Sequence, residues 1–543
     1  MGKSTKQLCY KADVIVIGGG LAGIVASYEL LSKGKKVLLL ERDHLKNLGG
    51  LAKHSFGGVM MVDTPLQKRS GIKDSPEIAL SDWYSYANFS KNDYWPKKWA
   101  EHYMEHSIDV LYEWLTHKKV KFLPVVNWPE RGMLVRGNSV PRWHIAWGTG
   151  HQIVTNIMKA LANHPQYKNL TVRTEHRVEQ FIYKNKTVVG CSGYLEGEEG
   201  CLFEGYGEAT VIACGGVSGG DHSFLRKSWD ETRGKQPKFM LNGSHRFADG
   251  LLHTRGQEMG ASLTNLDKQW FYAAGVHHPD RDPNVPNKGL SLVPPRSALW
   301  LNALGERIGP KPLVGYTDTS YLVDMILKQP GQYSWQVLNW NIAIKELAVS
   351  GCQYMTTFLK KNKLKLLWEL IFGNRALVRR LIEESKDFIV ADSMEELVGK
   401  MQALTKDEEF KPTREKVLSS VRNYDREVAR GETQDFQLEK IKEFKAYRGD
   451  RFRIAKSQTI ENSKALPLIA IREFILTRKS LGGFETNLSC EVLSSEDKTP
   501  IPGLYAIGEA SGFGGGGVHG QRSLEGTFLG SCVLTGHQLA ASL

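Results

Sequence analysis

Cysteine is scarce in this chain. Its 543 residues include seven cysteines, an odd number, and no two of them form a CxxC pair. The odd count and the absence of metal-ligand spacing argue against a disulfide framework and against a zinc site. Isolated thiols of this kind are typical of buried side chains in a reducing compartment. We therefore predict a cytoplasmic protein with no metal centre.

Long apolar runs are lacking as well. No run reaches the ~18 residues that a membrane-spanning helix needs. No apolar segment precedes the first predicted strand in MGKSTKQLCYKADVIVIGGG, so we expect neither a signal peptide nor an integral membrane segment.

A concentrated patch of one charge is also missing. The net charge of +12 comes from 71 Lys and Arg against 59 Asp and Glu, and these residues are spread along the whole chain. This spread predicts no nucleic-acid partner. The densest basic stretch, 359–380, combines helical periodicity with an apolar stripe. We interpret it as a solvated helix face, with contact to a membrane surface as the alternative.

Glycine is abundant by contrast, with 54 residues, many of them in clusters. The first cluster lies in ADVIVIGGGLAGIVASYELLSKGKKVLLLER (12–42), which has the pattern strand, glycine turn, helix, second strand. Gly18, Gly20 and Gly23 form GxGxxG, and Glu41 ends the second strand. Such glycines allow backbone amides to approach a pyrophosphate at a helix N-terminus, while the acidic residue binds a ribose. The segment predicts a dinucleotide site.

Two further glycine pairs follow in ERDHLKNLGGLAKHSFGGVMM (41–61). This segment resembles the flavin-contact loop of the fumarate reductase/succinate dehydrogenase flavoprotein superfamily, which lies along the ribityl chain and ring of FAD. Members with covalently attached FAD have a histidine six residues before the second pair. That position is Leu51 here, and His54 is out of register. The resemblance therefore implies non-covalent FAD.

Other segments extend this resemblance. Residues 176–194 have the pattern of a β-hairpin, and 208–219 that of a strand ending in small residues. The turn YAIGEASG contains a glutamate at the position that binds the ribityl hydroxyls in the family. The expected cofactor-binding residues are Gly18, Gly20, Leu21, Ala22, Gly23, Glu41, Arg42, Gly49, Gly50, Leu51, Ser55, Gly57, Gly58, Val178, Ala213, Cys214, Gly215, Asp249, Gly508, Glu509, Gly526, Thr527 and Phe528.

The composition of the chain changes between about 269 and 461, where an aromatic- and proline-rich stretch precedes several helical patterns. The resemblance implies an α/β fold: a discontinuous Rossmann-like FAD-binding domain (1–268 and 462–543) with an inserted α+β capping domain (269–461). The family places its proton-handling residue after a motif that corresponds here to 302–308. Tyr316 is the nearest match and Tyr321 the second. A tyrosine there can act as a base if its pKa falls from about 10; packing of a helix start is the alternative.

The last part of the chain contains the remaining candidates. Arg478 and Lys479 precede a GG pair, and Lys479 occupies the position of a substrate-binding histidine of fumarate reductases. In FGGGGVHGQRSLEGTFLG (513–530), Arg522 matches an arginine that clamps the substrate in those enzymes, although a salt bridge to Glu525 is an alternative. The helix expected from about Leu524 aims its N-terminus at the flavin. His519 is a further candidate without an assigned role.

These patterns are most similar to bacterial FAD-binding dehydrogenases related to 3-ketosteroid dehydrogenases. The resemblance implies α,β-dehydrogenation of an apolar ketone, with Arg522, Arg478 or Lys479 binding the carbonyl and Tyr316 removing a proton. A quinone or a carrier protein is the expected electron acceptor, because no second NAD(P) motif appears. The alternatives are a fumarate-reductase-like reduction of an unsaturated acid, a tRNA-modification-type flavoprotein, and an FAD-binding protein without turnover.

Overall fold

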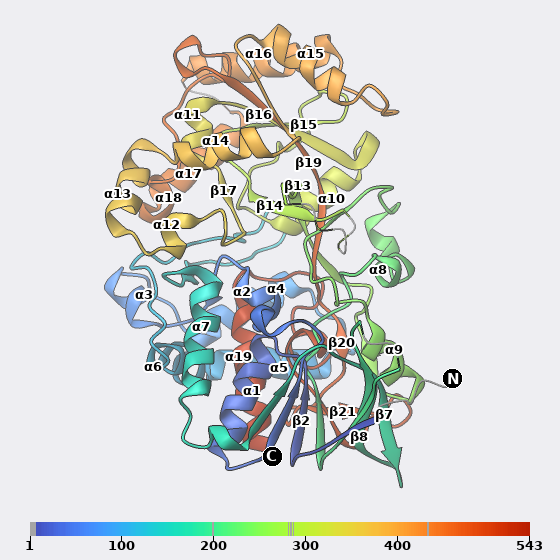
Figure 1. The fold of residues 1–543 in the computed structure, drawn as a ribbon. Helices are drawn as coiled ribbons and strands as arrows, with labels where there is room; N and C mark the ends of the chain where they lie inside the picture. Colours follow the sequence, from blue (N-terminus) through green and yellow to red (C-terminus); the bar gives the residue numbers. More distant parts are fainter. Residues whose placement is uncertain (1–6, 198–199, 281, 283–284, 286, 432–433) are drawn as a thin grey trace.

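The computed structural model describes residues 7–197, 200–280, 282, 285, 287–431 and 434–543. The chain forms two lobes, one above the other in Figure 1, and both chain ends lie in the lower lobe. The lower lobe contains most of the first half of the chain and the last 60 or so residues. This arrangement agrees with the predicted α/β fold with an insertion.

A mostly parallel sheet forms the centre of the lower lobe, in the order β21-β22-β10-β2-β3-β6. The strands β2, β3 and β10 are buried along their whole length because helices cover one face and a second, smaller sheet covers the other, which is why they are continuous apolar runs in the sequence. The helix α1 follows β2 directly and packs against α19 and α7. The bounds are β2 (Val14–Ile17), α1 (Leu21–Ser32), β3 (Val37–Leu40), α7 (Thr149–Ala162), β6 (Leu170–Arg173), β10 (Ala209–Ile212), β21 (Glu491–Leu493), β22 (Pro500–Ala506) and α19 (Thr527–Ser542).

Smaller elements complete the lower lobe. A second sheet has the order β1-β9-β8-β7, and its β7–β8 pair is the hairpin predicted for 176–194. The other elements are β1 (Gln7–Lys11), α2 (Gly50–Lys53), β4 (Gly58–Met60), α3 (Pro65–Arg69), α4 (Pro76–Ala87), α5 (Tyr94–Glu105), a π-helical stretch (Ser107–Glu113), α6 (Trp114–His117), β5 (Trp143–Ile145), β7 (His176–Lys184), β8 (Thr187–Leu195), β9 (Leu202–Tyr206), α8 (Ser223–Lys227), β11 (Leu241–Asn242), α9 (Leu251–Glu258), β12 (Leu263–Thr264) and β20 (Gly483–Phe484).

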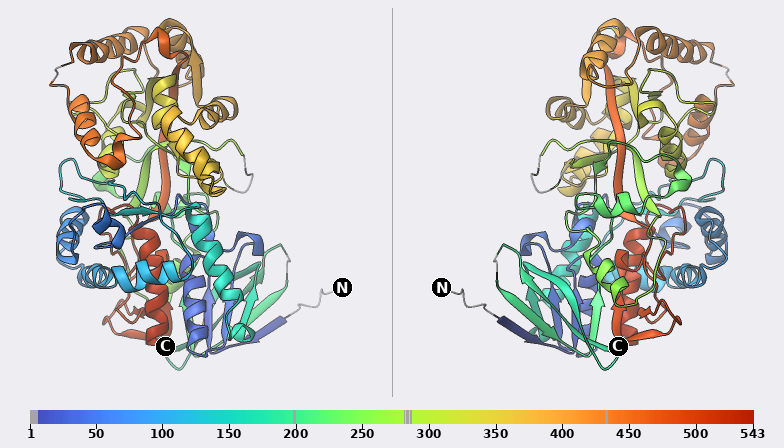
Figure 2. Two further views of the ribbon diagram at one scale, coloured as in Figure 1. Left: turned by 90° about the vertical axis from the view of Figure 1, so that its left-hand side faces the viewer. Right: turned by 90° about the vertical axis from the view of Figure 1, so that its right-hand side faces the viewer.

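The upper lobe surrounds a mixed sheet in the order β15-β16-β19-β13-β14-β17, with β11 and β18 also paired to β19. Its helices lie outside this sheet (Figures 1 and 2). The helix α15 begins after Ser393, whose side chain accepts a hydrogen bond from the Glu396 amide, as its sequence predicts. The bounds are β13 (Gln269–His277), β14 (Gly289–Val293), β15 (Leu299–Asn302), α10 (Thr319–Leu327), β16 (Tyr333–Asn339), α11 (Trp340–Glu346), β17 (Ala348–Val349), α12 (Thr356–Leu359), α13 (Lys363–Phe372), α14 (Arg375–Glu384), β18 (Phe388–Ala391), α15 (Met394–Leu404), α16 (Arg414–Arg430), α17 (Phe436–Ala446), α18 (Arg448–Arg451) and β19 (Leu468–Ser480).

Two antiparallel strands, β13 and β19, connect the lobes, and β19 runs down the middle of the molecule in Figure 2. Although β19 follows the predicted boundary at 461, it pairs with strands of the upper sheet, so the domain limits stay a prediction. The register shifts where Trp270 opposes Lys479 but Phe271 opposes Thr477. Arg478 is therefore the extra residue of a β-bulge, a feature that redirects side chains next to active sites.

Within the described ranges, we find no helix whose length and apolar character would let it span a bilayer.

Candidate active site

A cavity begins where β2 turns into α1, and the glycines of GxGxxG explain its shape. Gly18 has a φ of +114°, and a Cβ there would lie 2.3 Å from the carbonyl oxygen of Ala213. At Gly20 an added Cβ meets no atom within 4 Å, because the open cavity lies beside it. At Gly23 a Cβ would lie 2.0 Å from the Gly18 oxygen. Gly23 thus lets the helix pack on the turn and does not itself line the cavity.

Charged side chains surround the far end of this cavity. Glu41 accepts hydrogen bonds from the amides of Gly19 and Asp43, each at 2.7 Å. Asp249 accepts one from Arg42 at 2.7 Å and another, at 3.1 Å, from the Leu251 amide at the start of α9. These contacts hold acidic groups beside the glycine turn, where a ribose and a pyrophosphate bind in dinucleotide folds.

Most of the predicted cofactor-binding residues line this cavity or the one that adjoins it. Gly23, Gly508 and Thr527 do not: Gly508 donates its amide hydrogen to Thr535, and Thr527 donates its hydroxyl hydrogen to the Leu524 carbonyl. The predicted residues on the walls are Gly18, Gly20, Leu21, Ala22, Glu41, Arg42, Gly49, Gly50, Leu51, Ser55, Gly57, Gly58, Val178, Ala213, Cys214, Gly215, Asp249, Glu509, Gly526 and Phe528.

Two of these wall residues bear on the chemistry. Leu51 lines both cavities and offers no atom for a covalent flavin link, whereas His54 lies in a neighbouring pocket. Burial raises the pKa of the Cys214 thiol to about 12, so this side chain is not a reactive thiolate.

The second cavity lies where the lobes meet, and it joins the first at Leu51, Ala52, Glu509 and Cys532. The lower lobe contributes Gly57, Gly58 and the start of α19, which is a 16-residue helix with Gly526 as its N-cap. The upper lobe contributes mostly apolar side chains. The N-terminus of α19 therefore directs a partial positive charge to the junction of the cavities, where an anionic ring is stabilised.

Two cations enter this second cavity from the bulged end of β19. Both Arg478 and Lys479 line it, because the bulge breaks the alternation of side chains. The Lys479 ammonium lies 3.7 Å from the centre of the Phe528 ring and donates a hydrogen bond to the Tyr272 hydroxyl at 3.3 Å. Burial lowers the pKa of Lys479 to about 8, against the opposing effect of the Glu525 charge.

The sequence prediction missed an acidic group that faces these cations. Glu525 lines the cavity and accepts hydrogen bonds from Tyr272 at 2.6 Å and from Trp270 at 3.2 Å, both on Oε1. The sequence suggested Arg522 as its partner only as an alternative to substrate binding; the donors lie on β13, more than 250 positions away. No local spacing could reveal this contact.

Tyr316 also lines this cavity and comes from the upper lobe. Its backbone has a φ of +75°, in the left-handed region that bulky residues rarely adopt and that is concentrated at functional sites. Trp143 packs edge-on against its ring at 6.2 Å, and the Arg296 guanidinium lies 4.7 Å from the ring centre. Burial raises the pKa of Tyr316 above its usual range, while the charges of Arg453 and Arg296 act to lower it.

A second missed acid, Glu130, lies on the same wall. It accepts hydrogen bonds from the Tyr86 hydroxyl at 2.7 Å and from the Thr319 amide at 2.9 Å. Burial, together with the charges of Asp318 and Glu525, raises the pKa of Glu130 to about 8. Because protein groups already donate hydrogen bonds to its oxygens, Glu130 is better suited to holding the start of α10 in place than to binding a substrate.

The structure does not bring Arg522 and His519 to the wall of either cavity. Arg522 is half-buried, and its charge acts on Asp324 of α10. The His519 ring is fully buried between Trp83, Phe513 and Phe528, with centroid distances of 4.7–5.8 Å. Burial lowers its pKa well below the usual value, and neither ring nitrogen has a hydrogen-bond partner in the described part of the chain. His519 acts as a packing residue in this arrangement.

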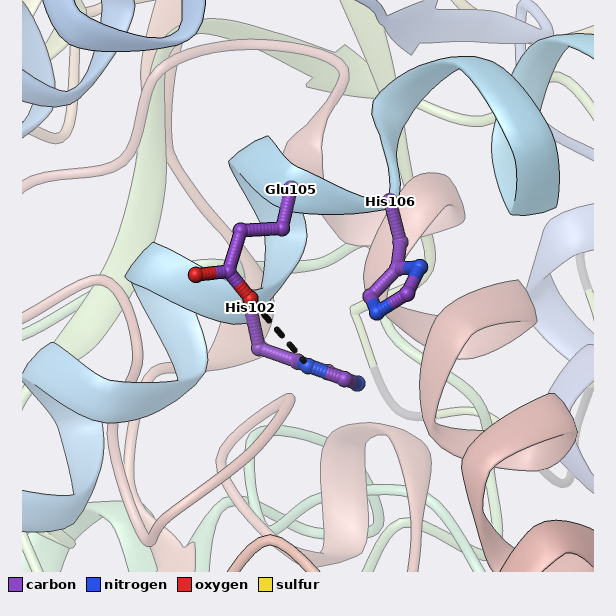
Figure 3. A group of neighbouring side chains, drawn as sticks. All are labelled: His102, Glu105 and His106. Atoms are coloured by element: carbon purple, nitrogen blue, oxygen red, sulfur yellow. Dashed lines mark ion pairs between the residues drawn. The ribbon is translucent and has the colours of Figure 1, made fainter.

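Outside the cavities, His102, Glu105 and His106 lie together near the end of α5 (Figure 3). The dashed line in Figure 3 joins His102 to Glu105 at 4.0 Å. Each imidazole already has a partner, Gln538 for His102 and Asp109 for His106. Because Glu105 is largely exposed, we assign no metal to this cluster.

The glycine turn, the acidic groups around it and the adjoining interlobe cavity define a dinucleotide-binding oxidoreductase with a cap over its reactive end. The chain matches the model of the FAD-binding domain family over residues 13–529. The protein therefore belongs to this family, and FAD is its cofactor. The cavity fits this cofactor, since its glycine cradle leaves space at Gly20 where any side chain would intrude.

Relatives extend over nearly the whole chain. A KsdD-like steroid dehydrogenase of Mycobacterium tuberculosis is 40% identical over 97% of this chain and 94% of its own length. The fold is similar to 3-ketosteroid Δ1-dehydrogenase from Sterolibacterium denitrificans (TM-score 0.66, 14% identity, 98% of this chain and 99% of that chain). It is also similar to a flavocytochrome c3 fumarate reductase (TM-score 0.65, 22% identity, 98% and 78%). The chain is thus an FAD-dependent oxidoreductase with the predicted fold.

Proposed function

We propose that this protein dehydrogenates a CH–CH bond next to the carbonyl of a ketosteroid or a similar apolar ketone. The observation that carries the proposal is the interlobe cavity, where Lys479 and Tyr316 both line a largely apolar space beside the cofactor cavity. The 40% identical relative named as a steroid dehydrogenase supports the substrate class.

The residues divide the reaction between them. The ammonium of Lys479, with Arg478 beside it, binds the substrate carbonyl oxygen and stabilises the negative charge that develops there. The phenolate form of Tyr316, whose own proton has passed to the solvent, accepts the proton from the α-carbon as that charge develops. FAD would be held by the residues that line the adjoining cavity and would supply the oxidant, a hydride acceptor for the β-carbon. One proton and one hydride leave, and one C=C bond forms.

Tyr316 is a better candidate for the proton acceptor than Glu525, for reasons of placement. Tyr316 belongs to the cap, whereas Glu525 directly precedes Gly526, the N-cap of α19 in the lower lobe. A substrate between the lobes would therefore present different faces to the two groups. Glu525 is also bound to Tyr272 and Trp270, while no protein group in the described ranges makes a hydrogen bond to the Tyr316 hydroxyl.

The electron acceptor in this proposal is a quinone or a carrier protein, and the working compartment is the cytoplasm. The absence of a second nucleotide motif in the sequence supports such an acceptor.

Anaerobic bleaching of the bound flavin tests the function. The purified holoprotein is mixed with saturated 3-ketosteroids, with smaller ketones and with succinate, and flavin absorbance is followed in a stopped-flow instrument. Rapid bleaching by a 3-ketosteroid is the expected result. Bleaching by succinate alone would contradict the proposal and favour a fumarate-type reaction.

We expect Lys479→Met to lower kcat/KM by roughly 10²–10³, the range found when one oxyanion-stabilising donor is removed. Arg522→Ala is the matched control, because it removes a cation that lies outside the cavity lining. Its kcat/KM should change by no more than about threefold, because Arg522 lines neither cavity and substitutions away from a site typically change a free energy by about 0.5 kcal/mol. If kcat/KM fell equally in both variants, the result would favour Arg522 as a substrate-binding residue.

The pH profile gives an independent prediction for Lys479. The proposed role needs the protonated ammonium, and the pKa of Lys479 is lowered to about 8. As the pH rises, the Tyr316 base gains phenolate, and above about 8 Lys479 loses its charge, so the rise of activity with pH should level off near pH 8. Comparing the profiles of the wild type and Lys479→Met checks this: the break near pH 8 should be missing from the variant.

A further inference from the structure

The helix α13 exposes an apolar face that no described part of the chain covers. Its sequence KLKLLWELIF places large apolar residues at spacings of three and four, which is one face of a helix. In most globular proteins such a face is buried. Here it points outward: Leu364, Leu367, Trp368, Ile371 and Phe372 are 50–83% exposed. The helix lies at the outer side of the upper lobe, next to α12 (Figure 1).

The charges around this face are of one sign. Lys360, Lys361, Lys363, Lys365 and Arg375 flank it and are exposed. The single acid within residues 359–375, Glu369, is turned inward, where it accepts a hydrogen bond from Thr357 at 2.8 Å.

The positive field extends onto the lower lobe. Burial and the nearby charges of Lys159 and Lys121 lower the pKa of Lys361. Lys159 belongs to α7, which packs against α12. Cations from both lobes therefore gather beside the apolar face, and such a cluster is stabilised by an anionic surface.

An apolar groove runs beneath α13 towards the substrate cavity. Leu366 and Leu370 line it from the helix, and the partly exposed Phe452 lines it from the loop after α18. Its inner end reaches Phe56, which also lines the interlobe cavity. The Phe358 ring lies 5.7 Å from Phe56, and Phe56 stacks on Trp143 at 5.7 Å.

We propose that α13 docks this protein on the surface of an anionic lipid bilayer, with its apolar face among the acyl chains and its lysines at the headgroups. Lysine-flanked helices with Trp, Phe and Leu on one side bind in this way. A second copy of the chain fits less well. A ten-residue helix is only ~15 Å long, and the two lysine clusters would face each other. Docking would place the open groove beside the lipid, where apolar ketones and quinones dissolve.

Vesicle flotation with the FAD-loaded protein tests this proposal without any substrate, so its outcome is independent of the proposed reaction. We expect the protein to float with vesicles of phosphatidylcholine and phosphatidylglycerol (70:30). Its affinity for vesicles of pure phosphatidylcholine should be lower by about tenfold or more. The double variant Leu367→Ser/Trp368→Ser should lose binding to both.

The variant Lys360→Gln/Lys361→Gln/Lys363→Gln/Lys365→Gln should lose the preference for anionic vesicles by a similar factor, since each lysine near such a surface adds to the attraction. The matched control is Leu134→Ser/Tyr183→Ser, which removes two equally exposed apolar side chains elsewhere and should float like the wild type. Flavin absorbance and the melting temperature confirm that each variant is folded.

Two results would overturn the proposal. One is a folded, yellow wild-type protein that floats with neither kind of vesicle. The other is light scattering that shows a dimer abolished by Leu367→Ser/Trp368→Ser, because α13 would then be an interface between copies.

Discussion

Tyr316→Phe should lower kcat for ketone dehydrogenation by about 10²–10⁴, the usual contribution of a positioned proton-transfer group. The change removes one oxygen atom and keeps the ring. The ring contacts with Trp143 and Arg296 are therefore preserved, and the left-handed backbone at this position stays the same. Rapid mixing with substrate under anaerobic conditions measures the rate of flavin reduction, and the visible spectrum confirms that FAD is still bound.

The variant Glu525→Gln is the matched comparison for this prediction. It keeps the size of the side chain and an oxygen to accept the hydrogen bond from Tyr272, but removes the negative charge. If Tyr316 is the base, Glu525→Gln should retain most of the flavin reduction rate. If Tyr316→Phe stays fully active while Glu525→Gln does not, the proton acceptor is Glu525 and our assignment is wrong.

The Tyr316 prediction also has a pH dependence with a definite sign. Burial raises the pKa of Tyr316 above its usual range, so the phenol is neutral at physiological pH. The base is therefore a minor phenolate fraction, and Arg296 and Arg453 increase this fraction because their charges oppose the shift. Replacing Arg453 by methionine should therefore slow flavin reduction and move its rise with pH to more alkaline values. A profile identical to that of the wild type would show that these charges do not assist Tyr316.

The cofactor end of the site could be predicted because its determinants are local. GxGxxG, the two glycine pairs and the hairpin each lie within about twenty residues, and the structure forms the turn, helix and strands expected from them. Gly18 and Gly23 are required by contacts with Ala213 and with the turn itself. Geometry that neighbouring residues determine can be recognised directly from the order of residue types in the sequence.

The reactive end was less predictable because contacts between distant strands determine it. The bulge that brings both Arg478 and Lys479 to the cavity depends on the register between β13 and β19, about 207 residues apart. A salt bridge between Glu525 and Arg522, three residues away, was the alternative that local spacing offered, but the chain from Gly514 to Gly526 is not helical and Glu525 binds Trp270 and Tyr272 of β13. Likewise, the sequence shows the apolar stripe on one face of α13, but it does not show that this face is exposed.

Three glycine-to-alanine variants should distinguish effects on the stability of the fold from effects on FAD affinity. Gly20→Ala is the variant expected to change the affinity alone. Gly20 has φ −69° and ψ −178°, which alanine adopts freely, and its Cβ would meet no protein atom within 4 Å. The FAD-free protein should therefore keep its melting temperature. The methyl group would occupy cavity space where the cofactor approaches the N-terminus of α1. The loss of charged hydrogen bonds worth about 1.5–3 kcal/mol each should weaken FAD binding roughly 100-fold or more, as measured by flavin fluorescence titration.

The other two variants are controls: one should lower both stability and FAD affinity, and the other should lower stability alone. Gly18→Ala places a Cβ 2.3 Å from the Ala213 oxygen in a left-handed conformation, so both the melting temperature and FAD binding should fall. Gly34→Ala has a similar positive φ of +79° but no atom within 4 Å, and it lies at the end of α1 far from the cavity. It should cost about 1 kcal/mol of stability from backbone strain alone and leave FAD affinity unchanged. If Gly20→Ala also left the affinity unchanged, the pyrophosphate would have to bind elsewhere than at the turn between β2 and α1.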